Sequence, residues 1–502
     1  GSTGRRRPAA AAASAAEARR RLARATRGPQ GADLAACGRA LREAATRTWA
    51  EEEAAEAAAE AVRLEASGDP LAARQAHLRA LSLGSPRPWE VRLRLAWLAQ
   101  VSPTCGGLTE CEAQLRAALD EIIAGGAGSG TGSTKRTKLA TAKKEAAATG
   151  KVERDVLVKL CVFLCQEGRD SEAAPLMLRG GWRHRLARCV LRYPLPNQTQ
   201  QVEEFQDVAA SQGLPVKAFD GALPEDMLAS LRKVFAPEAL FWKEHRYNSL
   251  SKCMSEDVGY FSYTHKLEEV PCQTSLDVAI RHILDVAKTS FPELKEARFA
   301  EWWAHCRPHA SGHQMHFDSD DEGIGGARHP ICSCVVYLEG GEDLGGPTLV
   351  TTQRLGDQAL ASRGWLVFPR PGRLAVFDGS VLHGVLPGRG TVQRPEARRV
   401  TWMVAFWRDI AVRPFGPDGL PGSSRPLPCT SEPLRAGGRV YTWHQMLQLK
   451  APAAPASNVP SSMQTVTPVA LPCIWEEVEA ASGGKAADVR EEMPEYNVCF
   501  QY

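Results

Sequence analysis

The stretch GHQMHFD at residues 312–318 decides how this sequence is interpreted. In a β-strand, residues two positions apart point to the same side, so His316 and Asp318 can converge on one metal ion. A third ligand has to come from elsewhere in the chain. His383 is the best candidate because it directly follows an apolar strand, within the stretch FDGSVLHGV at residues 377–385.

Two histidines and one carboxylate form the facial triad that binds non-haem iron(II) and leaves coordination positions open. A structural zinc site would instead be closed by four protein ligands. A single H-x-D motif is often only a surface pair, so the order of the following segments matters. A predicted strand, the turn GGPT at residues 345–348, two further strands and His383 follow the motif in that order.

A last strand, RRVTWMV at residues 398–404, follows the distal histidine. The period of two places Arg399 and Thr401 on the same side of this strand. A fixed guanidinium can pair bidentately with a carboxylate, and a neighbouring hydroxyl supplies one more hydrogen bond. We therefore expect the carboxylate of a keto acid to bind here. Three other arginines remain alternative anchors: Arg389, Arg394 and Arg398.

These features resemble the iron(II)/2-oxoglutarate-dependent dioxygenase superfamily, in particular its prolyl-4-hydroxylase-like branch. The resemblance covers residues 215–410 and includes the opening FDGALP at residues 219–224. It implies a double-stranded β-helix (jelly-roll) catalytic core with flanking helices. It also implies iron(II) bound by His316, Asp318 and His383.

The same resemblance implies 2-oxoglutarate as a cosubstrate bound by Arg399 and Thr401, and dioxygen as the second cosubstrate, with ascorbate as a further candidate cofactor. The implied reaction hydroxylates or oxidatively demethylates a substrate and releases succinate and CO2.

The sequence departs from the family pattern at two places. The family's basic anchor usually lies closer to the distal histidine than Arg399 does, and the polar insert at residues 390–397 would lengthen the intervening turn. An arginine anchor also argues against a collagen-type prolyl hydroxylase, where lysine is common. The approach strand, residues 301–307, lacks the family's tyrosine, and His305 or Arg307 is its candidate substitute in contacting the cosubstrate.

Short apolar runs separated by Gly and Pro turns predict a β-sandwich or barrel after residue 215. The expected strands are 298–304, 332–338, 348–352, 364–368, 374–377 and 400–407, and helical patterns cover 223–235 and 275–290. The loop histidines near the motif, among them His309 and His313, are expected to be held by turns rather than to bind metal.

The N-terminal part predicts helices, so the whole chain is expected to be α+β. Residues 1–30 are a basic Ala/Arg-rich leader that resembles a transit peptide. Residues 31–200 are rich in strong helix formers. Turns at 68–69 and 168–170 resemble those of tetratricopeptide repeats, and an irregular helical bundle is the alternative. This region is a candidate binding surface for a protein partner.

Two further segments are expected to be irregular. Residues 124–151, rich in Gly, Ser, Thr and Lys, predict a flexible basic loop inside the helical region. Residues 411–502 predict a Pro-rich tail that wraps around the core.

Composition bounds the function. The net charge of +3 over 502 residues does not indicate a nucleic-acid binder. No apolar run reaches the roughly 20 residues that a membrane helix needs. The 14 cysteines show no disulfide framework, which indicates a reducing intracellular compartment. That compartment is the cytoplasm, or an organelle if the leader is a transit peptide.

Two other functions compete with an active dioxygenase. A catalytically silent jelly roll with helical repeats would act as an interaction scaffold, because a fold alone does not fix function. A cupin-type enzyme would use another metal and no keto acid. The substrate, protein or small molecule, depends on loop geometry that the sequence does not reveal.

Overall fold

A computed structural model describes residues 34–67, 69–127, 138–195, 214–245, 247, 261–267, 272–320, 327–341, 344–357, 359–390, 392, 394, 397–414, 422–436, 438–453 and 460–478. The chain divides into two compact units, residues 1–91 and 92–502. The predicted leader at residues 1–30 lies outside the described residues.

Helices α2 (Leu34–Ser67) and α3 (Pro70–Ser82) pack against each other in the described part of the first unit. Helix α2 ends at Ser67 and α3 begins at Pro70, so the break between them falls where the sequence predicts a turn. Asp69 caps α3, because its side chain accepts a hydrogen bond from the Ala72 amide at 2.9 Å. Small buried residues such as Ala61 and Ala73 form the helix contact. The tetratricopeptide likeness of this pair stays a prediction.

The second unit begins within α4 and continues with further helices before its sheets. These elements are α4 (Pro88–Val101), η1 (Pro103–Cys105), α5 (Gly107–Ala127), α6 (Lys138–Gln166), α7 (Asp170–Arg179) and α8 (Arg188–Leu191). Leu115, Leu119 and Ile122 of α5 are buried, while Ile123 is exposed, so one side of this helix faces the interior. Successive helices α5, α6 and α7 pack against one another.

The prediction of a flexible loop over residues 124–151 was wrong at both of its ends. Helix α5 continues to Ala127, and α6 already begins at Lys138. Residues 138–151 contain mainly Ala, Lys, Glu and Thr, and Ala, Lys and Glu have high helix propensity even without an apolar face. The remaining residues, 128–137, are not described.

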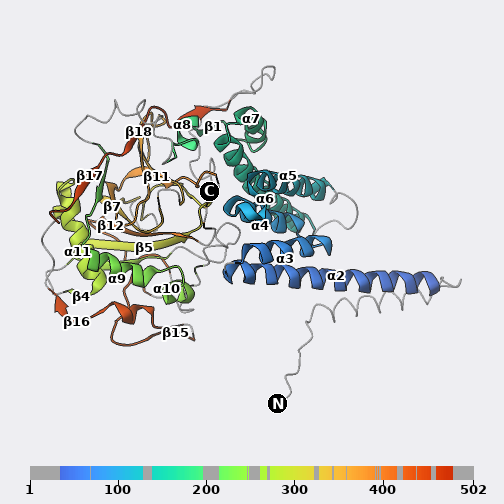
Figure 1. The fold of residues 1–502 in the computed structure, drawn as a ribbon, viewed down its shortest axis with the longest axis horizontal. Coiled ribbons are helices and arrows are strands. Elements are labelled where there is room, and N and C mark those ends of the chain that lie inside the picture. Colours follow the sequence, from blue (N-terminus) through green and yellow to red (C-terminus); the bar gives the residue numbers. More distant parts are fainter. Residues whose placement is uncertain are drawn as a thin grey trace, which may run out of the picture. The chain divides into compact units, whose positions relative to one another are not determined.

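Two sheets form the core of the second unit (Figure 1), and their strand pairs are antiparallel except for the edge pair β13–β3, which is parallel. The larger sheet has the order β13-β3-β5-β12-β7-β10-β2-β17, and the smaller has the order β18-β9-β8-β11-β6. The central strands are β2 (Val216–Asp220), β3 (Tyr263–Lys266), β5 (Phe299–Arg307), β6 (His313–His316), β7 (Cys332–Glu339), β8 (Thr348–Arg354), β9 (Gly364–Val367), β10 (Leu374–Asp378), β11 (Val381–Val385) and β12 (Arg399–Trp407).

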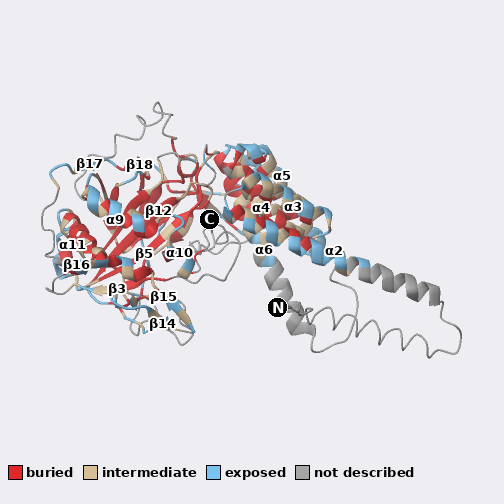
Figure 2. Ribbon diagram, turned by 60° about the horizontal axis from the view of Figure 1, so that its bottom comes forward, coloured by how far each residue is buried: buried red, intermediate tan, exposed pale blue. Residues whose placement is uncertain are grey.

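Both faces of the larger sheet are buried (Figure 2). Trp302 and Trp402 point into one core, which also contains residues of helices α9 (Glu225–Phe235), α10 (Leu240–Glu244) and α11 (Ser275–Lys288). Their neighbours Trp303 and Met403 point to the other side, into a second core shared with Trp365 of the smaller sheet. The period of two therefore divides each central strand between two apolar layers.

The prediction of an irregular C-terminal tail was wrong for much of residues 411–478. The segment forms β13 (Arg425–Pro426), β14 (Leu434–Ala436), β15 (Arg439–Tyr441), η6 (Trp443–Leu447), β16 (Gln448–Ala453), β17 (Gln464–Val466), β18 (Val469–Leu471) and β19 (Trp475–Glu477). Strand β17 pairs with β2 and β18 pairs with β9, so the tail extends both sheets. The tail strands are too short to show an alternating pattern.

Strand β19 pairs with a short strand inside the predicted helical region. That strand, β1 (His184–Leu186), lies within residues 31–200, where the sequence predicts only helices. The remaining short elements are β4 (Cys272–Thr274), which pairs with β16, and η5 (Pro292–Glu296). No helix among the described residues is long and apolar enough to cross a membrane.

Candidate metal centre

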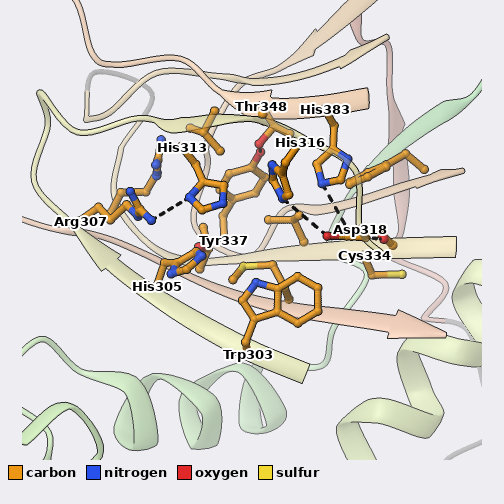
Figure 3. A pocket seen from close by; sticks show the side chains of 18 residues that line it. Trp303, His305, Arg307, His313, His316, Asp318, Cys334, Tyr337, Thr348 and His383 are labelled. Carbon is orange, nitrogen blue, oxygen red and sulfur yellow. Dashed lines mark hydrogen bonds and ion pairs between the residues drawn. The ribbon is translucent and has the colours of Figure 1, made fainter. Parts of the chain in front are cut away.

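The three predicted ligands meet between strands of the smaller sheet. His316 ends β6, Asp318 follows two residues later, and His383 lies on the adjacent strand β11 directly opposite His316. One ligand atom from each residue lies within 4.8 Å of the others. Among the residues that the structure describes, this is the only group of three or more potential metal ligands. Figure 3 shows the three side chains pointing toward one another.

Hydrogen bonds orient each ligand. The Nδ1 atoms of His316 and His383 lie 2.8 and 3.0 Å from the carbonyl oxygens of Gln314 and Val381. Since a carbonyl only accepts, we assign the proton of each ring to Nδ1, which leaves both Nε2 lone pairs free. These Nε2 atoms lie 3.6 and 3.7 Å from the Asp318 carboxylate. Backbone bonds of this kind fix the tautomer of metal-binding histidines.

The electrostatics of the centre favour metal-ready protonation states. Burial alone would raise the pKa of Asp318, but His383, His316 and the hydroxyl of Ser333 hold it at about 2. That hydroxyl donates a hydrogen bond to Asp318 Oδ2 at 2.6 Å. Burial lowers the pKa of His383 to about 4. At neutral pH, Asp318 is therefore a carboxylate and His383 a neutral imidazole, the forms that bind a divalent metal.

The centre lines one side of a pocket that encloses about 570 Å³ of empty space, its open mouth included. The lining comes from both sheets. Its apolar part includes Trp303 and Met403, and its polar part includes Arg399, Thr401 and His305. The structure thus brings all three predicted cosubstrate-binding residues into the pocket that holds the triad.

Two buried arginines give this pocket a positive charge. Arg399 is 3% exposed, and its Nη1 donates to the carbonyl of Gly346 at 2.9 Å. Arg307 on β5 lies opposite Arg399 on β12 in the strand register. Its guanidinium donates hydrogen bonds to the Gly312 carbonyl and to His313 Nδ1. Neither guanidinium forms an ion pair with a carboxylate within the described chain. Burial lowers the pKa of Arg399 to about 10, so it stays charged at neutral pH without a counter-ion.

The alternative anchors lie elsewhere. Arg389 donates to backbone carbonyls of Tyr193 and Gln166, and Arg398 donates to the carbonyl of Ala397. Arg394 is exposed. None of the three lines the pocket, so the strand period selected the arginine that does.

Sequence reasoning missed two polar residues of the pocket: Ser333, which donates to Asp318, and Tyr337. Tyr337 lies on β7 next to Thr401, and its hydroxyl contacts Thr348 Oγ1 at 2.6 Å. Its position two residues after Val335 on a predicted strand was a usable signal, since both side chains face the pocket. His305, by contrast, was expected, and its Nδ1 lies 3.1 Å from the hydroxyl of Tyr247.

Comparisons with known proteins give matches only among solved structures. A prolyl-4-hydroxylase from Pseudomonas putida is 19% identical, with 41% of this chain and 98% of that chain covered and a TM-score of 0.26. An oxidoreductase of the 2OG-Fe(II) oxygenase family from Burkholderia pseudomallei is 16% identical, with 40% and 93% covered and a TM-score of 0.18. Iron-bound HygX from Streptomyces hygroscopicus is 11% identical, with 46% and 96% covered and a TM-score of 0.22.

No protein-family model and no curated protein matches the sequence. Identities and TM-scores this low do not carry a functional argument. A functional assignment therefore has to rest on the site itself, which combines two histidines and one carboxylate with two buried arginines in one pocket.

Proposed function

We propose that this chain is an iron(II)- and 2-oxoglutarate-dependent dioxygenase with a double-stranded β-helix core. The observation that carries the proposal is the combination of an open triad with a buried arginine in the same pocket, Arg399, which has no carboxylate partner among the described residues. The triad, His316, Asp318 and His383, fits iron(II), because three protein ligands leave coordination positions for other molecules. Arg399 fits the distal carboxylate of 2-oxoglutarate.

Each residue of the pocket has a distinct role in this proposal. His316, Asp318 and His383 hold the metal, and Ser333 orients the carboxylate of Asp318 through its hydrogen bond. Arg399 neutralises the cosubstrate carboxylate, and Thr401 and Tyr337 offer hydroxyl groups beside it. His305 faces the same pocket from β5. Apolar side chains such as Trp303 exclude water from one side of the pocket.

Bound iron(II), 2-oxoglutarate and dioxygen would supply the oxidising chemistry, with succinate and CO2 as products. The substrate is a protein or a small molecule, and the outcome is hydroxylation or oxidative demethylation. Ascorbate is a candidate reductant. The helical region at residues 31–200 is a candidate surface for recruiting a protein substrate. The cysteines whose side chains the structure describes form no disulfide bonds, which supports a reducing intracellular compartment.

The test is an anaerobic titration of the iron(II)-loaded protein with 2-oxoglutarate, followed by visible absorption. Iron(II) chelated by a keto acid gives a metal-to-ligand charge-transfer band. We expect this band in the wild-type protein and its loss in His383→Ala. The control His184→Ala changes a histidine on β1, outside the pocket, and should keep the band.

The other outcomes separate the competing functions. If iron binds but no band appears, the keto-acid assignment is wrong and a cupin-type enzyme is favoured. If iron does not bind, the catalytically silent scaffold is favoured. Succinate formation that persists in His316→Ala would contradict the metal-ligand assignment.

A further inference from the structure

The helical segment of the second unit contacts the loop that follows the distal histidine. Gln166, at the end of α6, donates its amide to the carbonyl of Pro387 at 3.1 Å. Tyr193, just after α8, donates its hydroxyl to the same carbonyl at 3.0 Å. Arg389 returns the contact, since its guanidinium donates to the Tyr193 carbonyl and lies over the Tyr193 ring. Pro387 and Arg389 are therefore both hydrogen-bonded to the end of α6 or to the residues just after α8.

His309 links this loop to the turn beside Arg399. Its Nδ1 accepts a hydrogen bond from the amide of Gly345 at 3.0 Å, and its Nε2 lies 3.0 Å from the carbonyl of Arg389. An amide only donates and a carbonyl only accepts, so we assign the neutral tautomer with the proton on Nε2. The His309 carbonyl also accepts from the amide of Gly388 at 2.9 Å.

The close packing around His309 leaves little freedom for the loop. A Cβ atom on Gly388 would lie 2.4 Å from the His309 ring, so the ring rests directly on the glycine backbone. A Cβ atom on Gly346 would lie 2.1 Å from the carbonyl oxygen of Leu386. The loop at residues 386–389 and the turn at residues 345–346 are therefore locked together, with His309 between them.

The turn at residues 345–346 positions Arg399. The carbonyl of Gly346 accepts from Arg399 Nη1 at 2.9 Å, and a Cβ atom on Gly345 would lie 3.0 Å from the same nitrogen. A path of hydrogen bonds and two short backbone segments, residues 387–389 and 345–346, thus runs from Tyr193 and Gln166 through His309 to the arginine that lines the pocket. No member of this path between the helices and Arg399 lines the pocket itself.

We propose that His309, together with Tyr193 and Gln166, is a positioning residue for the anion-binding arginine Arg399. The inference rests on the proposed function, since it assigns Arg399 to the cosubstrate carboxylate. It also gives α6 and the residues after α8 a role besides recruitment of a partner: they complete the support of the cosubstrate site.

The variant His309→Phe keeps a ring over Gly388 but leaves the Gly345 amide and the Arg389 carbonyl without their partner. Loss of such an outer hydrogen bond weakens a site by on the order of tenfold. We expect the dissociation constant for 2-oxoglutarate, measured calorimetrically on the full-length Mn(II)-loaded protein, to rise by about that factor. Affinity for Mn(II) alone should not change.

The matched control is His282→Phe. His282 is also a buried histidine whose Nε2 contacts a carbonyl, that of Ala222, but it lies on α11 and outside the pocket. The His282→Phe variant should lower thermal stability as His309→Phe does, and it should leave the affinity for 2-oxoglutarate unchanged. Tyr193→Phe is the gentler variant, because it removes one hydroxyl, and it carries the test if His309→Phe does not fold. It should raise the same dissociation constant.

The outcomes distinguish this inference from the proposed function. If the wild-type protein binds Mn(II) but no 2-oxoglutarate, the proposed function fails. If the wild type binds 2-oxoglutarate and the folded variants bind it equally well, the positioning role is wrong. If His282→Phe weakens binding as much as His309→Phe does, the effect is general destabilisation and the inference is again overturned. In an active enzyme, the KM for 2-oxoglutarate should rise while kcat is retained.

Discussion

Arg399 is a residue whose function and stability should be in conflict. It is buried without a described carboxylate partner, and the fall of its pKa from 12.5 to about 10 corresponds to a folding cost on the order of 3 kcal/mol. We expect a buried positive charge with this folding cost to be retained only where it binds an anion. The guanidinium is therefore expected to weaken the apoprotein and to strengthen the complex with a dicarboxylate.

Replacement of Arg399 by glutamine should separate these two effects. We expect Arg399→Gln to lower the affinity for 2-oxoglutarate roughly 10- to 100-fold, because hydrogen bonds to charged groups are the strong ones. The melting temperature of the apoprotein should rise. Calorimetric titration and differential scanning calorimetry measure the two quantities, with Arg394→Gln as the exposed control. Retained affinity together with a lower melting temperature would contradict the assignment.

Glu301 predicts a pH dependence of stability. Burial raises its pKa to about 7, against hydrogen bonds from the hydroxyls of Ser262 and Ser424 that lower it. A carboxyl whose pKa is raised on folding contributes stability below its unfolded value of 4.5, and this is lost as the pH rises through 7. The loss should be on the order of 3 kcal/mol for the metal-free protein.

The variant Glu301→Gln keeps an oxygen that accepts from both serines and removes the charge. In urea denaturation, it should match the wild-type protein at pH 5 and be more stable at pH 8. The exposed control Glu53→Gln should behave like the wild type at both pH values. A pH slope that survives in Glu301→Gln would show that another group causes it.

The triad could be predicted from sequence because its information is local. His316 and Asp318 are two residues apart in one predicted strand, although β6 itself ends at His316, and His383 follows an apolar run. The strand period also separated Arg399 from its neighbour Arg398. His309 could not be predicted in its bridging role, since that depends on Gly345 and Arg389, which are distant in sequence and meet only through the register of the sheets.

At the scale of elements, long apolar segments were predictable and short ones were not. The expected strand at residues 400–407 agrees with β12, and the expected helix at 275–290 agrees with α11. Strand β12 is buried along its whole length, and α11 begins with a capping box between Thr274 and Asp277, so local and tertiary preferences coincide. Strands β17 and β18 have three residues each and depend on their partners.

The whole molecule differs from the expected domain at residues 215–410 because both sheets take their last strand from the tail. Strand β17 covers the edge of β2, and β18 covers the edge of β9. The tail also returns to the helical segment: β19 pairs with β1, and Arg185 of β1 forms an ion pair with Glu476 at 2.7 Å. Helices, sheets and tail in the second unit are thus tied by strand pairing, not only by the covalent chain.

A truncation after Pro460 should therefore damage more than the tail. It removes β17, β18 and β19, and it leaves β2, β9 and β1 each without a partner strand; such unpaired strand edges are templates for association with other chains. Truncation after Val478 is the matched control, because it keeps all three strands. We expect the shorter chain to have a lower melting temperature and to form aggregates in size-exclusion chromatography with light scattering. The control should have the melting temperature and the dispersion of the full-length chain. If both truncated chains are equally stable and equally dispersed, the tail strands do not contribute to the integrity of the sheets, and residues 215–410 are the independent domain that the sequence predicts.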